Sequence, residues 1–234
     1  MNTLVIDVGG TQVKVLATGQ TEPVKIVSGP QMSAATMVRD VLAAVKDVKY
    51  DHVTIGYPGV VVHDKPVHEP HNLAAGWVGF DYREAFGKPV RILNDAAMQA
   101  LGAYEGKRML FLGLGTGLGS ALIVDGVIEP MELAHLPYRK GRTFEEYVGA
   151  AGLKRLGKKR WRKHVERVID LLKTAVEADY VVLGGGNARL LAELAEGVRL
   201  GNNADAFKGG MRVWETAEKS TTHRSRKKPA SKQG

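Results

Sequence analysis

Apolar residues along the chain fall into short continuous runs that alternate with stretches of helical periodicity. The runs predict buried strands, as in TLVIDVG, QVKVLAT, HVTIGYPGVV and PVRIL. The periodic stretches predict amphipathic helices. One of them, SAATMVRDVLAAVK, places Met37, Val38, Val41, Leu42 and Val45 on one face. Such an alternation of strands and helices is typical of the α/β class.

Further helices are predicted after the midpoint of the first half and throughout the second. They cover DYREAF, DAAMQALGAY from Asp95, segments from about Phe144 and from about Trp161, the residues after the three glycines of DYVVLGGGN, and NADAFKGGMRVW.

Two glycine-rich turns stand between paired apolar runs. VIDVGGTQVKVLA and FLGLGTGLGSALIV share the order strand, turn containing Gly-Thr, strand, which predicts two hairpins. They begin halves of similar length, roughly residues 1–95 and 108–214. This internal echo predicts two related subdomains that face each other across a cleft, where ligands commonly bind.

The second glycine turn does not match the usual nucleotide-binding patterns. Counted from Gly113 or Gly115, the last glycine of G-x-G-x-x-G is missing, and no G-x-x-x-x-G-K-[ST] occurs in the chain. The following SALIVDG continues as a strand, whereas those sites need a helix N-terminus beside the phosphates. A turn between strands can still offer successive backbone N–H groups to an anion, or can be purely structural.

Composition and charge add three constraints. The chain has 44% hydrophobic and 25% charged residues, as in ordinary globular proteins. It has no cysteine, so neither disulfides nor Cys-ligated zinc are expected. The N-terminus lacks a basic region before a short apolar run, and no run approaches the roughly 18 apolar residues of a membrane span. We therefore expect a cytoplasmic protein without membrane contact.

Positive charge is concentrated in two places. Of the net charge of +8, residues 216–234 carry +5, and their lack of apolar residues predicts disorder. Residues 154–163, KRLGKKRWRK, hold seven cations and no acid. Either cluster is compatible with a solvated surface or with attraction for a polyanion.

Six motifs occur in the order found in one family of sugar kinases. They are DVGGTQVK, GYPGVV, LND before a helix, LGLGTGLGSAL, ELAH and VVLGGGN, spread over about residues 2–214. The chain resembles the ROK family of the actin/hexokinase-like superfamily, and within it the short polyphosphate glucokinases. The resemblance implies a two-lobed actin-like or ribonuclease H-like ATPase fold. We expect an N-terminal subdomain at 1–106, a C-terminal subdomain at 107–215 and a basic disordered tail at 216–234.

Two carboxylates are candidates for the chemistry of phosphoryl transfer, which needs a base and a divalent cation. Asp95 follows a predicted strand and, taken alone, also fits a helix N-cap. The resemblance implies that it is the catalytic base. Asp7 ends an apolar strand and fits a turn residue before Gly-Gly. The resemblance implies that Asp7 helps to hold Mg²⁺ through water.

The resemblance also assigns the contacts to the phosphoryl donor and to the sugar. The donor-binding residues implied are Asp7, Gly9, Gly10, Thr11, Lys14, Gly115, Thr116, Gly117, Gly184, Gly185 and Gly186. The sugar-binding residues implied are Asn72, Asn94, Glu132, His135 and Glu145, with Glu146 as the alternative register for the last. Amide, carboxylate and imidazole groups suit the paired donors and acceptors of sugar hydroxyls. Ala134 stands where the family's E-x-G-H motif has glycine.

These observations predict a glucokinase-type kinase that phosphorylates the 6-hydroxyl of a hexose with Mg²⁺. The donor is polyphosphate, ATP or both, and the sequence does not decide between them. A homodimer is implied by the resemblance, and the first strand starts too early for the helix-turn-helix of ROK repressors, so no specific DNA binding is expected. The alternative is a non-catalytic protein that senses sugar or binds a polyanion. The preferred hexose and the function of the tail are left open.

Overall fold

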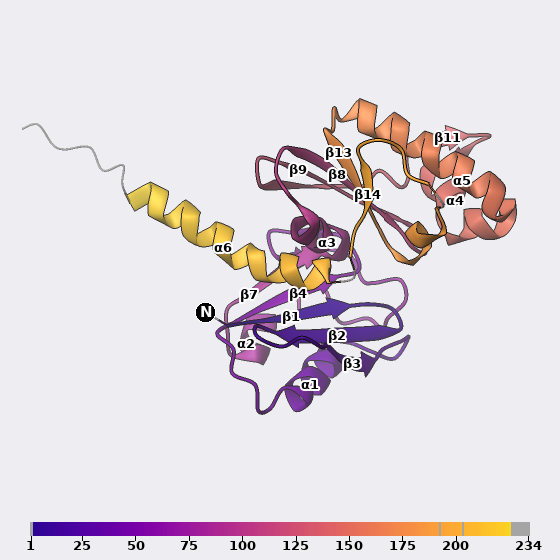
Figure 1. Ribbon diagram of the computed structural model, residues 1–234. Coiled ribbons are helices and arrows are strands. Elements are labelled where there is room, and N and C mark those ends of the chain that lie inside the picture. Colours follow the sequence, from indigo (N-terminus) through magenta and orange to yellow (C-terminus); the bar gives the residue numbers. More distant parts are fainter. Residues whose placement is uncertain (1, 192, 203, 226–234) are drawn as a thin grey trace, which may run out of the picture.

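Two five-stranded sheets organise the chain, one built from each half of the sequence (Figure 1). The structure is a computed structural model and describes residues 2–191, 193–202 and 204–225. The N-terminal sheet has the order β3-β2-β1-β4-β7, and the C-terminal sheet β10-β9-β8-β13-β14. The N-terminal strands are β1 (Thr3–Val8), β2 (Gln12–Ala17), β3 (Val24–Val27), β4 (His52–Tyr57) and β7 (Val90–Asn94). The C-terminal strands are β8 (Arg108–Leu114), β9 (Leu118–Val124), β10 (Val127–Met131), β13 (Tyr180–Gly184) and β14 (Val198–Leu200).

The two sheets have the same connectivity. In the first, β1 pairs antiparallel with β2, the next strand along the chain, and parallel with β4. In the second, β8 pairs antiparallel with β9 and parallel with β13. Both glycine-rich turns therefore close hairpins, as predicted, and the internal echo in the sequence corresponds to a repeated sheet. The fold is the two-lobed α/β arrangement expected.

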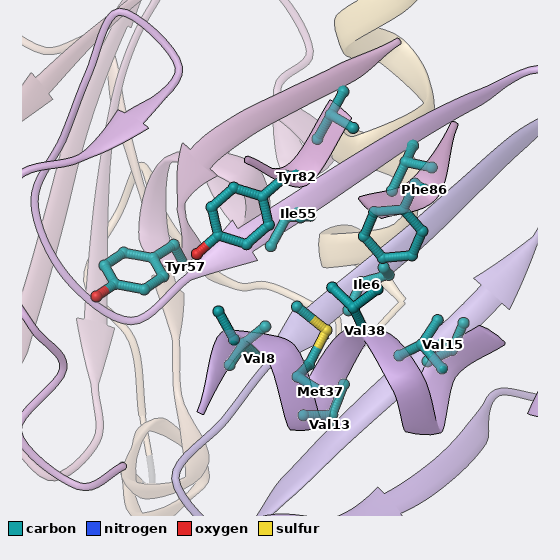
Figure 2. Close-up of a cluster of buried hydrophobic side chains, with 14 of the residues drawn as sticks. Ile6, Val8, Val13, Val15, Met37, Val38, Ile55, Tyr57, Tyr82 and Phe86 are labelled. Carbon is teal, nitrogen blue, oxygen red and sulfur yellow. The ribbon is translucent and has the colours of Figure 1, made fainter. Parts of the chain in front are cut away.

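Two helices cover the outer face of the N-terminal sheet, α1 (Ala34–Ala44) and α2 (Tyr82–Phe86). The side chain of Ser33 caps α1 by accepting from the Thr36 N–H, and Gly87 ends α2 with a left-handed φ of 61°. Figure 2 shows the resulting core, in which side chains of α1 and α2 meet those of β1, β2 and β4. The small hairpin of β5 (Val61–Val62) and β6 (Lys65–Pro66) lies beyond β4 in the chain.

The outer face of the C-terminal sheet is covered by α4 (Phe144–Val148) and α5 (Ala150–Ala175). A short hairpin of β11 (Pro137–Arg139) and β12 (Arg142–Thr143) leads into α4. Gly157 has non-helical angles (φ 72°, ψ 156°) and divides α5 into two segments. After this break the helix buries Val165, Val168, Ile169 and Leu172, and Val176 just beyond its end is partly buried.

The inner faces of both sheets share a layer formed by α3 (Asp95–Ala103) and the start of α6 (Asp205–Ser225). Figure 1 shows the rest of α6 projecting away from the lobes. The two helices cross closely at two glycines. A Cβ on Gly102 would overlap the carbonyl of Asp205, and one on Gly209 would overlap the carbonyl of Met98. Glycine is therefore needed at both positions, and the crossing joins the lobes through α3.

The structure differs from the sequence predictions in several segments. The helix predicted after Gly186 is a short 3₁₀ turn, η1 (Gly186–Leu190). Three strands of the two main sheets, β3, β10 and β14, were not predicted. Disorder was expected from residue 216, but α6 continues to Ser225, and residues 226–234 lie outside the described residues. The exact subdomain boundaries at 106/107 and 215/216 remain predictions. In the part of the chain that the structure describes, no helix is both long and apolar enough to cross a bilayer.

Candidate active site

The first glycine turn places a charged pair at the end of β1. The hairpin register sets Asp7 opposite Lys14, with 3.6 Å between the Asp7 Oδ2 and the Lys14 Nζ. Burial raises the pKa of Asp7, and the neighbouring Lys14 ammonium opposes this by lowering it. The Gly9 N–H donates to the carbonyl of Gln12 at 3.0 Å and closes the turn. The pair thus combines a carboxylate and an ammonium beside bare backbone, which is the chemistry that a phosphate and its cation need.

Asn72 approaches this turn from the loop before α2. A Cβ on Gly10 would lie 3.2 Å from the Cβ of Asn72, so the asparagine packs directly over the glycine. Thr11 is exposed in the same turn. A predicted sugar contact and three predicted phosphate contacts, Gly9, Gly10 and Thr11, are therefore neighbours in the N-terminal lobe.

The next two residues of interest, Asn94 and Asp95, join β7 to α3, and only one of them caps the helix. The Asn94 side-chain oxygen accepts from the N–H groups of Ala96 and Ala97 at 3.0 and 3.2 Å, and its Nδ2 donates to the carbonyl of Gly59 at 3.1 Å. Asp95 stands at the first helical position, where its Oδ1 accepts from the Ala96 N–H at 2.7 Å. Asn94 therefore satisfies the cap, and the Asp95 carboxylate is left available for chemistry.

The Asp95 carboxylate is buried at the start of α3. Its pKa is raised to about 6, mainly by burial and in addition by the negative charge of Asp7, while the Ala96 N–H opposes this rise. A carboxylate with a pKa near 6 is ionised at neutral pH and is still a useful proton acceptor.

The second glycine turn is lined by α4 and the start of α5. Glu145 Oε2 accepts from the Leu118 N–H at 3.2 Å, and a Cβ on Gly117 would overlap this carboxylate. Glu146 instead completes a capping box with Thr143, whose N–H donates to Glu146 Oε2 at 2.8 Å. Of the two registers, Glu145 is therefore the one that lies at the glycine turn. Thr116 is exposed at the tip of this turn.

The predicted pair Glu132 and His135 lies close to Glu145. The two side chains are exposed and 3.7 Å apart, measured from Glu132 Oε1 to His135 Nε2. The carbonyl of Ala134 accepts from the Glu145 N–H at 3.0 Å and ties the segment to α4. Sequence reasoning missed Ser120, whose Oγ donates to the Met131 carbonyl at 2.7 Å and holds the other side of this segment.

A cavity of about 310 Å³ lies between the lobes and joins the first and third glycine segments. Its walls include Asp7 and Lys14 from the N-terminal lobe, and residues 184–186 and Arg189 from the C-terminal lobe. Asn187 Nδ2 donates to the carbonyl of Gly115 at 3.0 Å and connects the second turn to this wall. Larger cavities of about 570 and 680 Å³ contain neither Asp7 nor Asp95 in their walls. We call the 310 Å³ space the donor cavity.

The structure brings together only part of the predicted donor-binding set and part of the predicted sugar-binding set. Among the donor set, Asp7, Lys14 and the three glycines at 184–186 line the cavity, whereas the turns at 9–11 and 115–117 lie outside its walls. In the sugar set, Glu132, His135 and Glu145 are held together, and Asn72 lies at the other lobe's turn. The missed wall residue Arg189 gave no signal beyond a cation shortly after the third glycine segment.

The carboxylates suit a magnesium ion that is bound together with phosphates. In the described residues no group of three or more His, Cys, Asp or Glu side chains forms a closed metal cage. Mg²⁺ usually takes one or two carboxylates and completes its shell with water and substrate phosphates. Asp7 is largely buried with only Lys14 as a cationic partner and with Asp95 as a repulsive neighbour. A divalent cation beside Asp7 would relieve this repulsion, so the residues fit the ion.

The chain is similar in sequence and fold to known proteins of one family. The model of the ROK family matches residues 3–129. A polyphosphate glucokinase of Mycobacterium tuberculosis is 32% identical over 208 residues, which cover 79% of this chain and 77% of the relative. Among solved structures, the inorganic polyphosphate/ATP-glucomannokinase of Arthrobacter sp. strain KM superposes with a TM-score of 0.77 at 22% identity, covering 92% of this chain and 99% of that one. The ROK hexokinase of Thermus thermophilus has a TM-score of 0.75 at 18% identity, covering 94% and 100%.

Proposed function

The chain belongs to the ROK family, and we propose on that premise that it is a glucokinase-type hexose kinase. It transfers a phosphoryl group from polyphosphate, ATP or both to the 6-hydroxyl of glucose. The observation that carries the proposal is the coupling of two carboxylates where the lobes meet. One of them, Asp7, lines the donor cavity, and the other, Asp95, has a pKa of about 6. The names of the relatives, a polyphosphate glucokinase and a polyphosphate/ATP-dependent kinase, support the reaction class.

Asp95 would act as the general base. Its carboxylate takes the proton of the 6-hydroxyl while the hydroxyl oxygen forms a bond to the terminal phosphorus of the donor. The bridging P–O bond of the donor breaks, and the shortened donor leaves with that oxygen. The cap formed by Asn94 holds the start of α3 in place and thereby fixes the direction of the Asp95 side chain.

The donor phosphates would lie in the donor cavity and against the glycine turns. Lys14 and Arg189 supply positive charge from opposite lobes, and residues 184–186 leave room for the phosphates beside bare backbone. Asp7 would hold Mg²⁺ through water, and the ion would neutralise charge on the transferring phosphoryl group. Gly9, Gly10, Thr11, Gly115, Thr116 and Gly117 remain proposed phosphate contacts.

The sugar would bind where the two lobes bring their remaining polar residues together. Glu132, His135 and Glu145 from the C-terminal lobe, with Asn72 and Asn94 from the N-terminal lobe, would hold its hydroxyls. The side-chain oxygen of Asn94 already accepts from α3, and its Nδ2 donates one N–H to the carbonyl of Gly59. Asn94 would therefore offer the sugar its one remaining N–H. A homodimer and a cytoplasmic location are further parts of the proposal.

A coupled assay that detects glucose 6-phosphate, run with ATP and with polyphosphate, tests the reaction. We expect turnover with at least one donor. The Asp95→Asn variant should lose about 10²–10⁴-fold in kcat, with glucose binding by calorimetry unchanged. The matched control is Asp47→Asn, which removes an exposed carboxylate after α1 and should retain full activity. Intact glucose binding without turnover with either donor would contradict the kinase and favour a non-catalytic sugar-binding protein.

A further inference from the structure

The first half of α5 carries an unusual concentration of uncompensated cations. Residues 154–163, here called the cationic tract, contain seven Lys or Arg residues and no acid. Five of them are exposed and make no hydrogen bond or ion pair with another described residue. These five are Lys154, Lys158, Lys159, Arg160 and Lys163. Their mutual repulsion costs free energy that nothing else among the described residues offsets.

The helix that carries the tract touches elements of the donor site. Before the tract, the N–H of Ala150, at the start of α5, donates to the carbonyls of Gly115 and Thr116 at 3.1 and 3.0 Å. Near the end of the tract, Arg162 Nε donates to the carbonyl of Leu190 at 2.6 Å. Leu190 is the last residue of η1, whose residues Gly186 and Arg189 line the donor cavity. Through Arg162 the tract is therefore joined to the segment that forms one wall of the donor cavity.

The cations of α5 are unevenly distributed. The tract holds no acid, whereas residues 164–175 hold two acids, Glu166 and Asp170, and two cations, Arg167 and Lys173. An ordinary solvated helix face mixes both signs, often in pairs three or four residues apart. The rest of α5 is of this ordinary kind, so the net positive charge of the helix lies in the tract.

The spacing of the cations places several of them on one side of the helix. Lys158 precedes Arg162 by four residues and thus lies one turn away on the side that faces η1. Lys159 and Lys163 form a parallel row next to it. Gly157 interrupts the helix inside the tract, so these rows lie in the regular segment that follows it. Several cations in adjacent rows suit an extended anion with many charges more than a single phosphate.

We propose that the cationic tract binds the distal phosphates of a linear polyphosphate whose terminal phosphoryl group lies in the donor cavity. This inference rests on the proposed function and adds a second contact region for one of its two donors. Binding along the tract releases counterions from both partners, so affinity should fall steeply with salt. ATP carries its phosphates as one short group that the donor cavity holds, and it does not reach the tract.

The test compares two double variants with the same change in charge. Lys158→Gln/Lys159→Gln removes two cations of the tract, and Lys46→Gln/Lys49→Gln removes two exposed cations after α1 in the other lobe. For each protein, kcat/KM is measured with long-chain polyphosphate, with tripolyphosphate and with ATP at several salt concentrations. Direct binding of long-chain polyphosphate without glucose is measured by calorimetry.

For the tract variant we expect the KM and the Kd of long-chain polyphosphate to rise on the order of tenfold. The slope of log affinity against log salt should decrease by about 1.5, with the ATP and glucose parameters unchanged. Equal losses with ATP, or no difference from the Lys46/Lys49 control, would overturn the proposal. If the wild-type protein turns over neither donor, the proposed function fails, and the binding measurement alone still decides whether the tract holds polyphosphate.

Discussion

Replacing Asp95 by asparagine should stabilise the fold while it removes the proposed catalytic base. The pKa of Asp95 is raised from 3.8 to about 6, mainly by burial, so the folded protein favours the protonated carboxyl. The preference of the fold for the protonated Asp95 carboxyl contributes to the free energy of unfolding. This contribution is fully present below pH 3.8 and is lost as the pH rises through about 6. The loss is about 3 kcal/mol at pH 8 and roughly half of that at pH 5.

Asparagine keeps the acceptor for the Ala96 N–H and carries no charge, so it avoids this cost. We expect Asp95→Asn to unfold at a higher urea concentration than the wild type, by about 3 kcal/mol at pH 8 and about half as much at pH 5. Urea unfolding in metal-free buffer, followed by circular dichroism, measures both values. Comparing the two pH values separates the titration of Asp95 from any effect of the substitution itself.

The control is Asp47→Asn, an exposed position after α1, where a change within about 0.5 kcal/mol is expected. If Asp95→Asn were no more stable than the wild type at pH 8, the fold would not be holding this carboxylate in an unfavourable environment. The argument that Asp95 is kept basic for catalysis would then lose its physical foundation.

Two further predictions concern α3 and the helix that crosses it, α6. The kcat/KM for glucose should fall about tenfold per pH unit below about pH 6 and level off above it, because the proposed base, Asp95, must be deprotonated. A plateau of kcat/KM that extends down to pH 4.5 would instead indicate a carboxyl with an ordinary pKa. Gly209→Ala should cost about 1–3 kcal/mol and lower Tm by several degrees, because its Cβ would overlap the Met98 carbonyl. The exposed control Glu215→Ala on the same helix should leave Tm nearly unchanged, and equal melting of both variants would contradict this close crossing.

The sheets could be predicted because their signals are local. Each glycine hairpin has two apolar runs of matched length with a turn between them, and both formed as expected. The short strands β3 and β14 are half exposed and lack a continuous apolar run, so no pattern marked them. The helix predicted after Gly186 is missing because that segment bonds outward, through Asn187 to Gly115 and through Leu190 to Arg162. Such contacts between distant residues leave no periodicity in a single sequence.

In the candidate site, too, residues with a local sequence signal could be predicted, and residues defined by side-chain contacts could not. Asp7, Lys14 and Asp95 stand at strand ends, where periodicity and turns locate them within a residue or so. Which residue caps α3, and which of two adjacent glutamates lies at the second turn, depended on side-chain hydrogen bonds. The sequence left both open, and the structure assigns the cap to Asn94 and the turn contact to Glu145. Ser120 and Arg189 had no distinguishing context at all.

The repeated sheet also explains why one hairpin carries charges and the other only glycines. Asp7 pairs with Lys14 on one side and with Gly56 on the other. The equivalent position in the second sheet is Gly113, which pairs with Gly119 and Gly184.

Two of these glycines make room for α3. A Cβ on Gly56 would overlap Met98, and one on Gly119 would lie 2.9 Å from the Ala96 Cβ. Both partners belong to α3, the helix that begins with Asp95. A Cβ on Gly184 would instead overlap the ring of Phe111 in β8 and would also lie 3.0 Å from Gln99 Oε1. The strict spacing of glycines in the second hairpin therefore serves two ends, since Gly119 admits the helix and Gly117 admits Glu145. The first half of the duplicated sheet supplies the charged groups, and glycines in both halves let α3, the helix that carries the proposed base, pack closely against the sheets.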